Sequence, residues 1–448
     1  MSKETPLLTE NQIRDILQKV PDPYLGKGFS VLAAFQGFER RRVGVVEELK
    51  LNFKLNYPLS NIGTLFSAAL LRTFQANLQG LTIQAVMQDQ GAMQVQEIVR
   101  GQGKLKDLGT TQDQGTIQAQ GTIQGQGTIQ GQETIQGQGT TQGQANSQGQ
   151  DIQGDQPTLK LEIHNTWKVQ RHVIQKTLKP IKAVKNTIAI ASGKGGVGKS
   201  TTAVNLALAL QAEGARVGIL DADIYGPSQP RMLGIQERPT VRDNKRILPV
   251  LSHGLQSMSM GYLVGEEAPM VWRGPMASSA VQQLTLETEW CELDYLILDL
   301  PPGTGDIQLT LVQKIPLTGV VIVSTPQEIA LQDARKALNM FRKLHIPILG
   351  MVENMSLHIC SECGHHDPIF GLNGGLEMAK QYEIPWLGQL PLDRRIREKS
   401  DEGIPIVLAE PEGEIARLYK DIARTMTAQL SLLPRDYHAG ISPLLVKE

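Results

Sequence analysis

The segment IAIASGKGGVGKS, residues 188–200, decides the fold of this chain. Its first four residues, Ile188–Ala191, form a short apolar run that predicts a buried β-strand, and the residues after Ser200 predict a helix over Thr201–Leu210. The glycines and lysines between them have the spacing of a phosphate-binding loop. In such a loop, backbone N–H groups surround the phosphate oxygens and the helix N-terminus adds a partial positive charge. The segment therefore predicts an ATP-binding site.

The polar residues of this loop have different expected roles. The Lys199 ammonium group is expected to contact the β- and γ-phosphates, and the Ser200 hydroxyl is expected to ligate Mg²⁺. Lys194 is expected to bring a second cation to the transferred phosphoryl group; the alternative is a solvated loop lysine. The residues expected to contact the nucleotide are Gly193, Lys194, Gly195, Gly196, Val197, Gly198, Lys199, Ser200 and Thr201.

Aspartate residues follow two later apolar runs, at the points where those strands are expected to end. Asp223 comes after Val217–Leu220, and Asp299 follows Leu296–Leu298. A carboxylate beside a phosphate-binding loop can hold Mg²⁺ through water or orient the attacking water. Its alternative role is to cap the next helix. We expect Asp223 and Asp299 to serve the site, and both roles stay open for Asp306.

The C-terminal part of the chain alternates apolar strand-like runs with helical stretches. Near-continuous apolar strands separated by helices predict a parallel sheet covered on both faces. Ligands bind such a sheet beyond the carboxyl ends of its strands, where the loop and the aspartates are expected to lie. The predicted fold class is therefore α/β: a P-loop NTPase domain over residues 161–448 with a mostly parallel sheet covered by helices. Its predicted elements include strands at Ile188–Ala191, Val217–Leu220, Leu296–Leu298, Val320–Val323 and Ile348–Val352 and a helix at Glu328–Phe341.

Residues 1–90 predict a small α/β domain that precedes the NTPase domain. Apolar residues recur there at helical spacing in two stretches and alternate with polar residues in another, as in a half-buried strand. The predicted elements are a helix through Ile13, Ile16 and Leu17, strands at Leu49–Leu55 and Leu81–Val86, and a helix at Ala68–Leu78.

Residues 91–160 are predicted to be a linker, because most of them form a hexad repeat. From Gly109 to Gln150 the repeat reads GTTQDQ, GTIQAQ, GTIQGQ and close variants. A hexad repeat can also build a parallel β-helix. Its third position is Ile in only four hexads, however, which leaves too little apolar surface to offset the loss of conformational entropy. We expect the repeat to be disordered and the geometry between the two domains to vary.

The composition argues against several classes of partner. The chain has 44 Lys and Arg against 45 Asp and Glu, so no basic excess is available to neutralise a nucleic-acid backbone. No apolar run approaches the about 20 residues of a membrane-spanning helix, and the N-terminus lacks the pattern of a secretory signal. Three cysteines are too few for a disulfide framework. We expect a cytoplasmic protein with neither nucleic-acid nor membrane partners.

Two of the cysteines, Cys360 and Cys363, form a CxxC pair flanked by histidines. Such a pair can be half of a zinc site, a redox dithiol or half of an iron–sulfur site. A redox dithiol normally opens a helix, which the following Gly364 disfavours. His365 and His366 are available to complete a zinc site, but they crowd the same turn.

The number of thiolates decides how an iron–sulfur site would be built. A cluster usually takes four thiolates, and one chain has only two close together, since Cys291 is expected to be a packing residue. Two copies that face each other across a twofold axis would supply four. The zinc alternative stays open, because thiolate pairs also bind zinc.

The motifs GKGGVGKST, LDADIYGPSQP, WRGPM, LDLPPGTGD, VENMS, CSECGH and LPLDRRIRE occur in this order over roughly residues 180 to 440. In this order they resemble the Mrp/ApbC family of iron–sulfur cluster carrier ATPases, which belongs to the MinD/ParA-like group of P-loop proteins. The resemblance implies a homodimer in which Lys194 reaches the partner's ATP. It also implies that Asp223 positions the hydrolytic water, that Asp299 supports magnesium and that Asn354 reads the adenine ring.

The same resemblance implies a cargo and its partners. Cys360 and Cys363 of two subunits would bridge a [4Fe-4S] cluster, with apo iron–sulfur proteins and a cluster assembly scaffold as partners. The N-terminal domain resembles the small domain that precedes many such ATPases. Where the family has a cysteine-containing segment, this chain has Asn56–Ser60, which contains none. We therefore expect that domain to be an interaction or scaffold module that donates no thiolate.

Other functions compatible with a P-loop are a MinD- or ParA-like positioning ATPase, a zinc-binding P-loop ATPase and an electron-donating reductase. A positioning ATPase would attach to a membrane through a basic amphipathic helix, or to DNA through a basic face. The apolar stripe over Glu414–Leu430 is predicted to pack into the core instead. A reductase with a bridged cluster normally uses separated single cysteines rather than CxxC.

Overall fold

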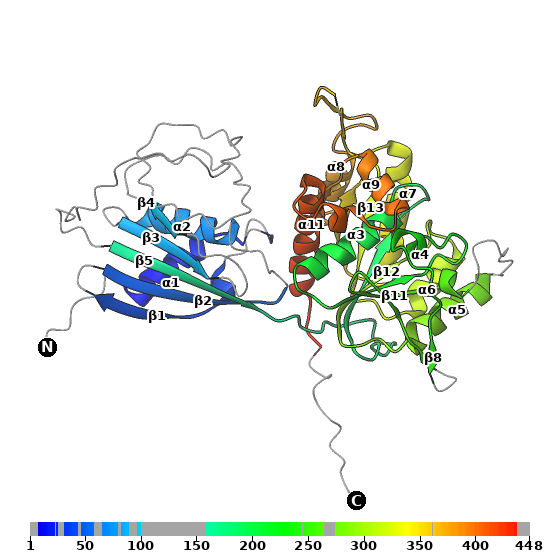
Figure 1. Cartoon of the computed structure of the whole chain (residues 1–448), viewed down its shortest axis with the longest axis horizontal. Helices are drawn as coiled ribbons and strands as arrows, with labels where there is room; N and C mark the ends of the chain where they lie inside the picture. The colour runs from blue at the N-terminus through cyan, green and yellow to red at the C-terminus, as the bar shows by residue number, and fades with distance from the viewer. Residues whose placement is uncertain are drawn as a thin grey trace, which may run out of the picture. The chain divides into compact units, whose positions relative to one another are not determined.

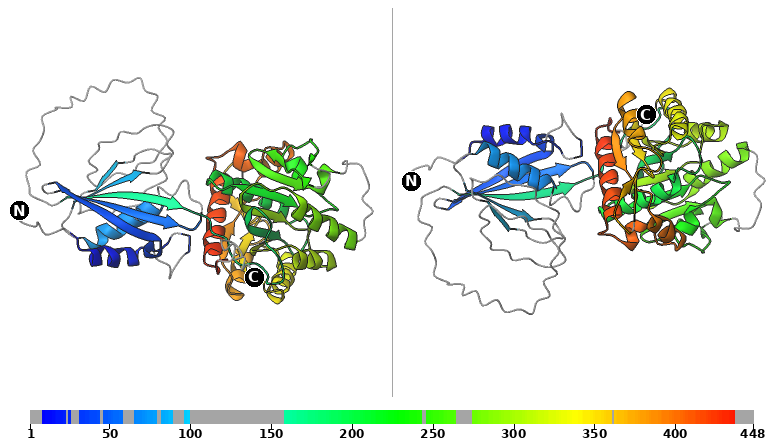
Figure 2. Two further views of the ribbon diagram at one scale, coloured as in Figure 1. Left: turned by 90° about the horizontal axis from the view of Figure 1, so that it is seen from below. Right: turned by 90° about the horizontal axis from the view of Figure 1, so that it is seen from above.

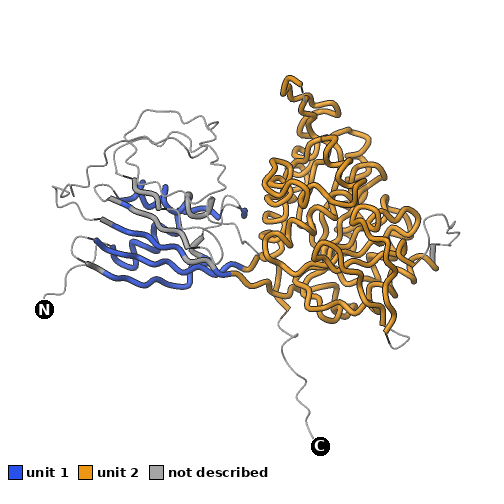
Figure 3. The backbone as a smooth tube through the Cα atoms, in the orientation of Figure 1, with its two compact units in different colours: residues 1–55, 61–166 blue, residues 56–60, 167–448 orange. Residues whose placement is uncertain are grey.

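The computed structural model describes residues 8–22, 24–25, 31–43, 46–57, 65–78, 82–88, 96–99, 158–242, 246–263, 274–360 and 362–436. The chain divides into two compact units, residues 1–55 with 61–166 and residues 56–60 with 167–448 (Figure 3). The predicted disorder of the hexad repeat, residues 109–150, concerns residues outside those described.

The first unit is a five-stranded sheet with helices α1 and α2 on one face (Figures 1 and 2). The strand order is β1-β2-β5-β3-β4, with β1 antiparallel to β2 and β3 parallel to β5. Helix α1 begins with a capping box between Thr9 and Gln12. The elements are α1 (Glu10–Lys19), β1 (Phe35–Val43), β2 (Val46–Leu55), α2 (Leu65–Asn77), β3 (Thr82–Gln88), β4 (Gln96–Val99) and β5 (Thr158–Trp167).

The four elements predicted in this unit are present as α1, β2, α2 and β3, but the limits of the unit differ from the predicted 1–90. Strand β5 follows the repeat in sequence and pairs with β3, so the sheet of the first unit extends to residues that were assigned to the linker and the NTPase domain. Leu159, Leu161 and Ile163 alternate along β5 and are buried. Their period of two is the sequence signal for this strand.

The second unit is an eight-stranded sheet with helices on both faces (Figure 1). The strand order is β10-β11-β7-β12-β6-β13-β14-β17. The pairings from β11 to β17 are all parallel, and β10 is an antiparallel edge strand. The predicted α/β fold is thereby confirmed. The strands are β6 (Val184–Ala191), β7 (Val217–Asp221), β10 (Val250–Ser252), β11 (Leu255–Ser259), β12 (Leu293–Asp299), β13 (Gly319–Ser324), β14 (Ile348–Glu353) and β17 (Trp386–Gln389).

Alternate residues of the central strands belong to two separate apolar layers. Ile188 and Ile190 of β6 pack in the layer formed with α3 and α11, whereas Ala189 and Ala191 pack in the layer formed with α5, α6 and α7. This alternation is what burial on both faces requires of a central strand. The helices are α3 (Lys199–Ala212), α4 (Gln229–Met232), α5 (Gly274–Glu287), α6 (Asp306–Lys314), α7 (Glu328–Lys343), α8 (Gly374–Gln381), α9 (Arg394–Asp401), α10 (Ile406–Ala409) and α11 (Glu414–Ser431).

The apolar stripe of α11 packs into the core, as predicted. Ile415, Tyr419, Ile422 and Met426 are all buried in the layer shared with α3. Among the residues described, no helix is both long enough and apolar enough to cross a membrane.

Candidate functional site

The phosphate-binding loop connects the end of β6 to the first residue of α3. Gly196 and Gly198 have φ angles of +81° and +79°, a left-handed conformation that glycine adopts without steric cost. A Cβ atom on Gly198 would lie 2.1 Å from Nδ2 of Asn354, and one on Gly193 would lie 2.1 Å from the carbonyl carbon of Asp333 in α7. Close approach therefore requires glycine at these two positions.

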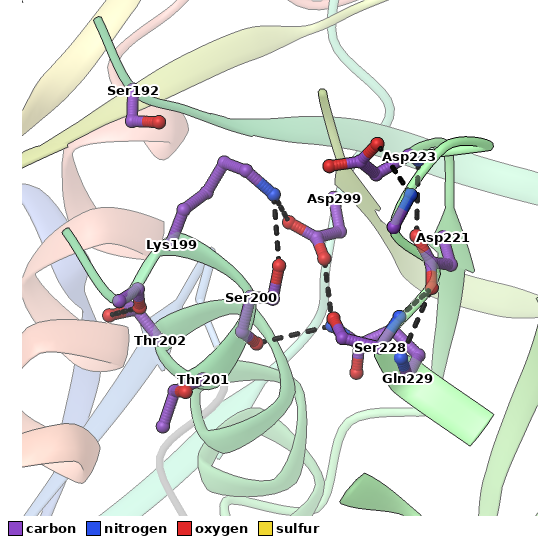
Figure 4. Close-up of polar contacts among 12 residues, drawn as sticks. Ser192, Lys199, Ser200, Thr201, Thr202, Asp221, Asp223, Ser228, Gln229 and Asp299 are labelled. Atoms are coloured by element: carbon purple, nitrogen blue, oxygen red, sulfur yellow. Dashed lines mark hydrogen bonds and ion pairs between the residues drawn. The ribbon is translucent and has the colours of Figure 1, made fainter. Parts of the chain in front are cut away.

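Lys199 and Ser200 lie at the start of α3, next to the end of β12 (Figure 4). Asp299 is opposite Ile190 in the parallel pairing of β12 with β6, which brings its carboxylate beside the loop. The Lys199 ammonium group forms a buried ion pair with Asp299 and donates to Ser200 Oγ at 3.0 Å. The structure thus brings together three residues that the sequence predicts for one site.

Two residues outside the predicted contacts, Asp221 and Gln229, connect this group to the end of β7. The Gln229 Nε2 atom donates to Asp299 Oδ2 at 2.9 Å and to the Ser200 carbonyl at 3.1 Å. The backbone N–H groups of Ser228 and Gln229 donate to Asp221 Oδ2 at 2.9 and 3.1 Å. The sequence signals for them are the place of Asp221 at the end of a predicted strand and the polar pair between Pro227 and Pro230.

Asp223 lies just beyond the end of β7, beside Asp221 (Figure 4). Its backbone N–H donates to Asp221 Oδ1 at 3.1 Å, and its own Oδ1 accepts from the Gly226 N–H at 3.3 Å. Burial raises the pKa of Asp223; the Lys199 charge opposes this shift and the Asp299 charge adds to it. A carboxylate with a raised pKa is a better acceptor for a proton from water. Asp306 is exposed and is the first residue of α6, so its charge can also stabilise the N-terminus of that helix, which is the alternative to a role in the site.

The residues around Ser200 fit a hydrated magnesium ion. Mg²⁺ takes oxygen ligands and keeps several of its waters. The Ser200 hydroxyl and the Asp221 and Asp299 carboxylates supply oxygen atoms here. In addition, Oε1 of Gln229 and Oγ of Ser228 are buried and have no hydrogen-bond partner among the described residues. A buried unpaired polar atom costs about 1–3 kcal/mol, and water molecules bound to a metal would supply the hydrogen bonds that these two atoms lack.

The other predicted contacts of the loop lie along its length. The Val197 carbonyl accepts from Asn354 Nδ2 at 2.9 Å, so Asn354 is attached directly to the loop. Thr201 Oγ1 lies 3.8 Å from the sulfur of Met232. Lys194 is partly exposed, and within the described residues its side chain forms no hydrogen bond or ion pair. Gly195 is exposed and a Cβ there would meet only ordinary contacts with Pro302.

The cysteine pair occupies the turn of a short antiparallel hairpin between β15 (His358–Ile359) and β16 (His366–Asp367). The turn is closed by a hydrogen bond from the Cys360 N–H to the His365 carbonyl at 2.9 Å. Cys363 is exposed and Cys360 is partly exposed. Backbone N–H groups of Cys363 and Glu362, and then the Cys363 thiol, lower the pKa of Cys360. The lowered pKa favours the thiolate, which is the form that binds metals.

The described residues do not assemble a zinc site within one chain. No group of three or more His, Cys, Asp or Glu side chains placed to hold a metal ion occurs among them. His365 and His366 are exposed beside the turn. The prediction that Cys291 packs in the interior is wrong: Cys291 is exposed, and the buried residue of that segment is Trp290. The Cys291 main chain is instead bonded to the side chain of Gln256, with both distances 2.8 Å.

One anchored segment, residues 354–360, leads from the nucleotide loop to the cysteines. The Ser356 N–H and hydroxyl both donate to the Leu390 carbonyl at 3.0 Å. The Leu392 N–H donates to the Leu357 carbonyl at 2.8 Å, and the His358 ring Nδ1 lies 3.1 Å from the Leu392 carbonyl. Asn354 and Cys360 therefore lie at the two ends of a segment that hydrogen bonds hold in place.

The buried Asp221 predicts a dependence of stability on pH. Burial, and then the charge of Asp299, raise the pKa of Asp221 to about 7, whereas an unfolded chain ionises this carboxyl near pH 4, by the reference value of about 3.9. Between these values the native state binds more protons, so the free energy of unfolding contributed by this group falls as pH rises. We expect Asp221→Asn to melt close to the unaltered protein at pH 5 but on the order of 5 °C higher at pH 8, in EDTA. A difference that stays constant with pH would contradict this assignment.

Comparisons with known proteins point to one family. Residues 183–427 match the model of the family described as "ParA: NUBPL iron-transfer P-loop NTPase". The chain is 57% identical over 271 residues to an iron-sulfur cluster carrier protein of Escherichia coli K12, covering 59% of this chain and 73% of the relative. It is 50% identical over 258 residues to the iron-sulfur cluster transfer protein NUBPL of Mus musculus, covering 57% of this chain and 81% of the relative. A solved nucleotide-binding protein of Archaeoglobus fulgidus in complex with ADP is 36% identical, with a TM-score of 0.46 over 53% of this chain and 93% of that chain.

Proposed function

Because the chain belongs to the NUBPL iron-transfer P-loop NTPase family of ParA-type proteins, we propose that it is an ATPase that binds an iron–sulfur cluster and transfers it to apo-proteins. The observation that carries this proposal is the presence of two sites in one unit. A buried site around Lys199 and Asp299 lies at one end of the anchored segment 354–360, and the thiols of Cys360 and Cys363 lie at the other. The relatives named as cluster carrier or transfer proteins give further support.

In the proposed nucleotide site, Lys199 is the residue that binds the β- and γ-phosphates. Phosphate oxygens and the Asp299 carboxylate compete for its ammonium group, so phosphate binding releases Asp299 from this ion pair. Ser200 would hold Mg²⁺ directly and Asp299 would hold it through water; the ion, when bound, neutralises charge on the phosphates. Asp223 orients the attacking water and accepts its proton, for which its raised pKa is suited. Asn354 reads the adenine ring.

The cargo site that we propose needs two copies of the chain. Four thiolates usually hold an iron–sulfur cluster, and Cys360 and Cys363 of two copies would supply four to one [4Fe-4S] cluster. In the same homodimer Lys194 would contact the partner's ATP, which agrees with a partly exposed side chain that forms no hydrogen bond or ion pair within the described residues. The first unit is proposed to be an interaction or scaffold module. We place the protein in the cytoplasm, with apo iron–sulfur proteins and an assembly scaffold as partners and without nucleic acid or membrane.

Anaerobic reconstitution with iron and sulfide tests the proposal. We expect a dimer by light scattering, with about four iron and four sulfide per two chains and a broad visible charge-transfer absorption. We also expect the loaded protein to activate an apo-enzyme that requires a [4Fe-4S] cluster. Stoichiometric zinc without sulfide would favour the zinc-binding ATPase instead, and a strictly monomeric loaded protein would exclude the bridged cluster.

A further inference from the structure

Gln229 is a buried residue whose side chain and backbone both form hydrogen bonds to residues of the proposed nucleotide site. It is fully buried at the start of α4, between Pro227-Ser228 and Pro230. Its side-chain Nε2 contacts both the carboxylate of Asp299 and the main chain of Ser200, and its backbone N–H contacts Asp221 (Figure 4). One residue therefore connects the carboxyl ends of β7 and β12 with the first turn of α3.

The orientation of the Gln229 amide follows from its partners. Both neighbours of the terminal nitrogen, the Asp299 carboxylate and the Ser200 carbonyl, are acceptors, so the group that faces them must be the NH₂ with its two hydrogen atoms. The oxygen Oε1 must then point the other way. It is buried and has no partner among the described residues.

The neighbouring residue, Ser228, carries a second buried oxygen, its Oγ atom, without a hydrogen-bond partner in the described part of the chain. Buried polar atoms without partners are rare in folded proteins, and two on adjacent residues, one of which bonds to the Ser200 main chain, indicate a polar ligand that donates hydrogen bonds. Water molecules bound to a cation are such donors, and Mg²⁺ retains most of its waters in protein sites.

From these contacts we infer that Gln229 is a positioning residue for the metal–nucleotide complex, whose amide nitrogen orients Asp299 and whose amide oxygen accepts a hydrogen bond from a water on the magnesium ion. This inference deepens the proposed function and rests on its nucleotide site, though not on the cluster. The role differs from that of a direct ligand, because Gln229 acts on the ion only through Asp299 and through water. Outer-shell residues of this kind commonly change metal affinity by about 10- to 100-fold when they are replaced.

The test is the magnesium dependence of nucleotide binding, measured without turnover. The full-length chain is titrated with Mg²⁺ at a saturating concentration of ADP, and the rise in melting temperature is followed. Gln229→Met keeps the length of the side chain and removes both polar atoms. We expect its half-maximal Mg²⁺ concentration to rise about 10-fold or more, while ADP binding in EDTA stays within about twofold of the unaltered protein. Gln229→Asn, which retracts the amide, is expected to raise the half-maximal Mg²⁺ concentration as well. It provides the test if Gln229→Met does not fold.

A matched control variant separates the positioning role from the loss of a buried amide. Gln308→Leu removes a buried glutamine of α6 whose side-chain amide also lacks partners in the described residues, and it should keep the unaltered midpoint. An unaltered midpoint in both Gln229→Met and Gln229→Asn, or a rise in Gln308→Leu equal to that in Gln229→Met, overturns the inference. Absence of any magnesium effect in the unaltered protein would overturn the proposed nucleotide site as well.

Discussion

Replacing Lys199 by alanine is expected to lower ATP turnover by about 10²- to 10³-fold, the loss typical of one positioned charge at a transferred group. The assay is steady-state phosphate release by the anaerobically purified protein, with cluster content measured on the same sample. Cluster content should stay close to that of the unaltered protein, because the hairpin of Cys360 and Cys363 is held by the pairing of β15 with β16, to which Lys199 does not contribute. Turnover by Lys199→Ala within about tenfold of the unaltered rate would contradict the assigned role.

Because Lys199 forms a buried ion pair with Asp299, replacing Lys199 is expected to lower stability as well as turnover, and a control must separate the two effects. Removing Lys199 leaves the Asp299 carboxylate buried without its cation, which commonly destabilises a protein by about 3–5 kcal/mol. The double variant Lys199→Ala/Asp299→Asn removes both charges and should regain most of the lost melting temperature without regaining turnover. Lys194→Ala, in the same loop but without a buried partner, should melt like the unaltered protein and lose turnover while it still binds ADP. If Lys194→Ala keeps full turnover, the solvated-lysine alternative is correct.

Cys360→Ala and Cys363→Ala are each expected to retain less than about one tenth of the iron and sulfide of the unaltered protein, because a cluster usually needs all four thiolates. Nucleotide binding should be unchanged within about twofold, since the nucleotide site lies at the other end of the segment 354–360. Iron and sulfide analysis after anaerobic reconstitution checks the first expectation, and ADP titration checks the second.

Cys291→Ala is the matched control for both cysteine variants. Cys291 is exposed like Cys363, but it lies before β12 and bonds through its main chain to Gln256. Its replacement should leave the cluster content unchanged. A cluster lost equally in Cys291→Ala, or a normal cluster load in Cys360→Ala, would show that the hairpin is not the cargo site.

The sequence predicts most of the second unit because the controlling patterns are local. Apolar runs identify β6, β7, β12, β13 and β14, and the spacing of glycines and lysines after β6 identifies the loop. The resemblance carried by the ordered motifs is confirmed by the family match over residues 183–427. The predicted grouping of Lys199, Ser200 and Asp299 follows from one rule, that parallel strands end at the same edge of a sheet.

The residues that the sequence did not assign depend on neighbours far away in the chain. Gln229 gains its place from contacts with Ser200 and Asp299, which lie 29 and 70 positions away. Asp221 is distinguished from Asp223 by its deeper burial at the strand end. Cys291 was expected to pack because it lies in the lead-in to a strand, yet Cys291 is exposed and its neighbour Trp290 is buried. The pattern of neighbouring residues in the sequence predicts none of these contacts.

By itself the sequence determined the central strands β6, β7, β12, β13 and β14, the phosphate-binding loop and the position of two thiols in one turn. Each of these depends on residues that are close in sequence, where backbone geometry and side-chain period leave few alternatives. Only the tertiary structure decided that β5 completes the first sheet after the repeat, and that Gln229 joins Asp299 to α3. These arrangements depend on packing and hydrogen bonding between distant segments. A short stretch of sequence holds only one partner of each such contact, so it cannot predict the contact.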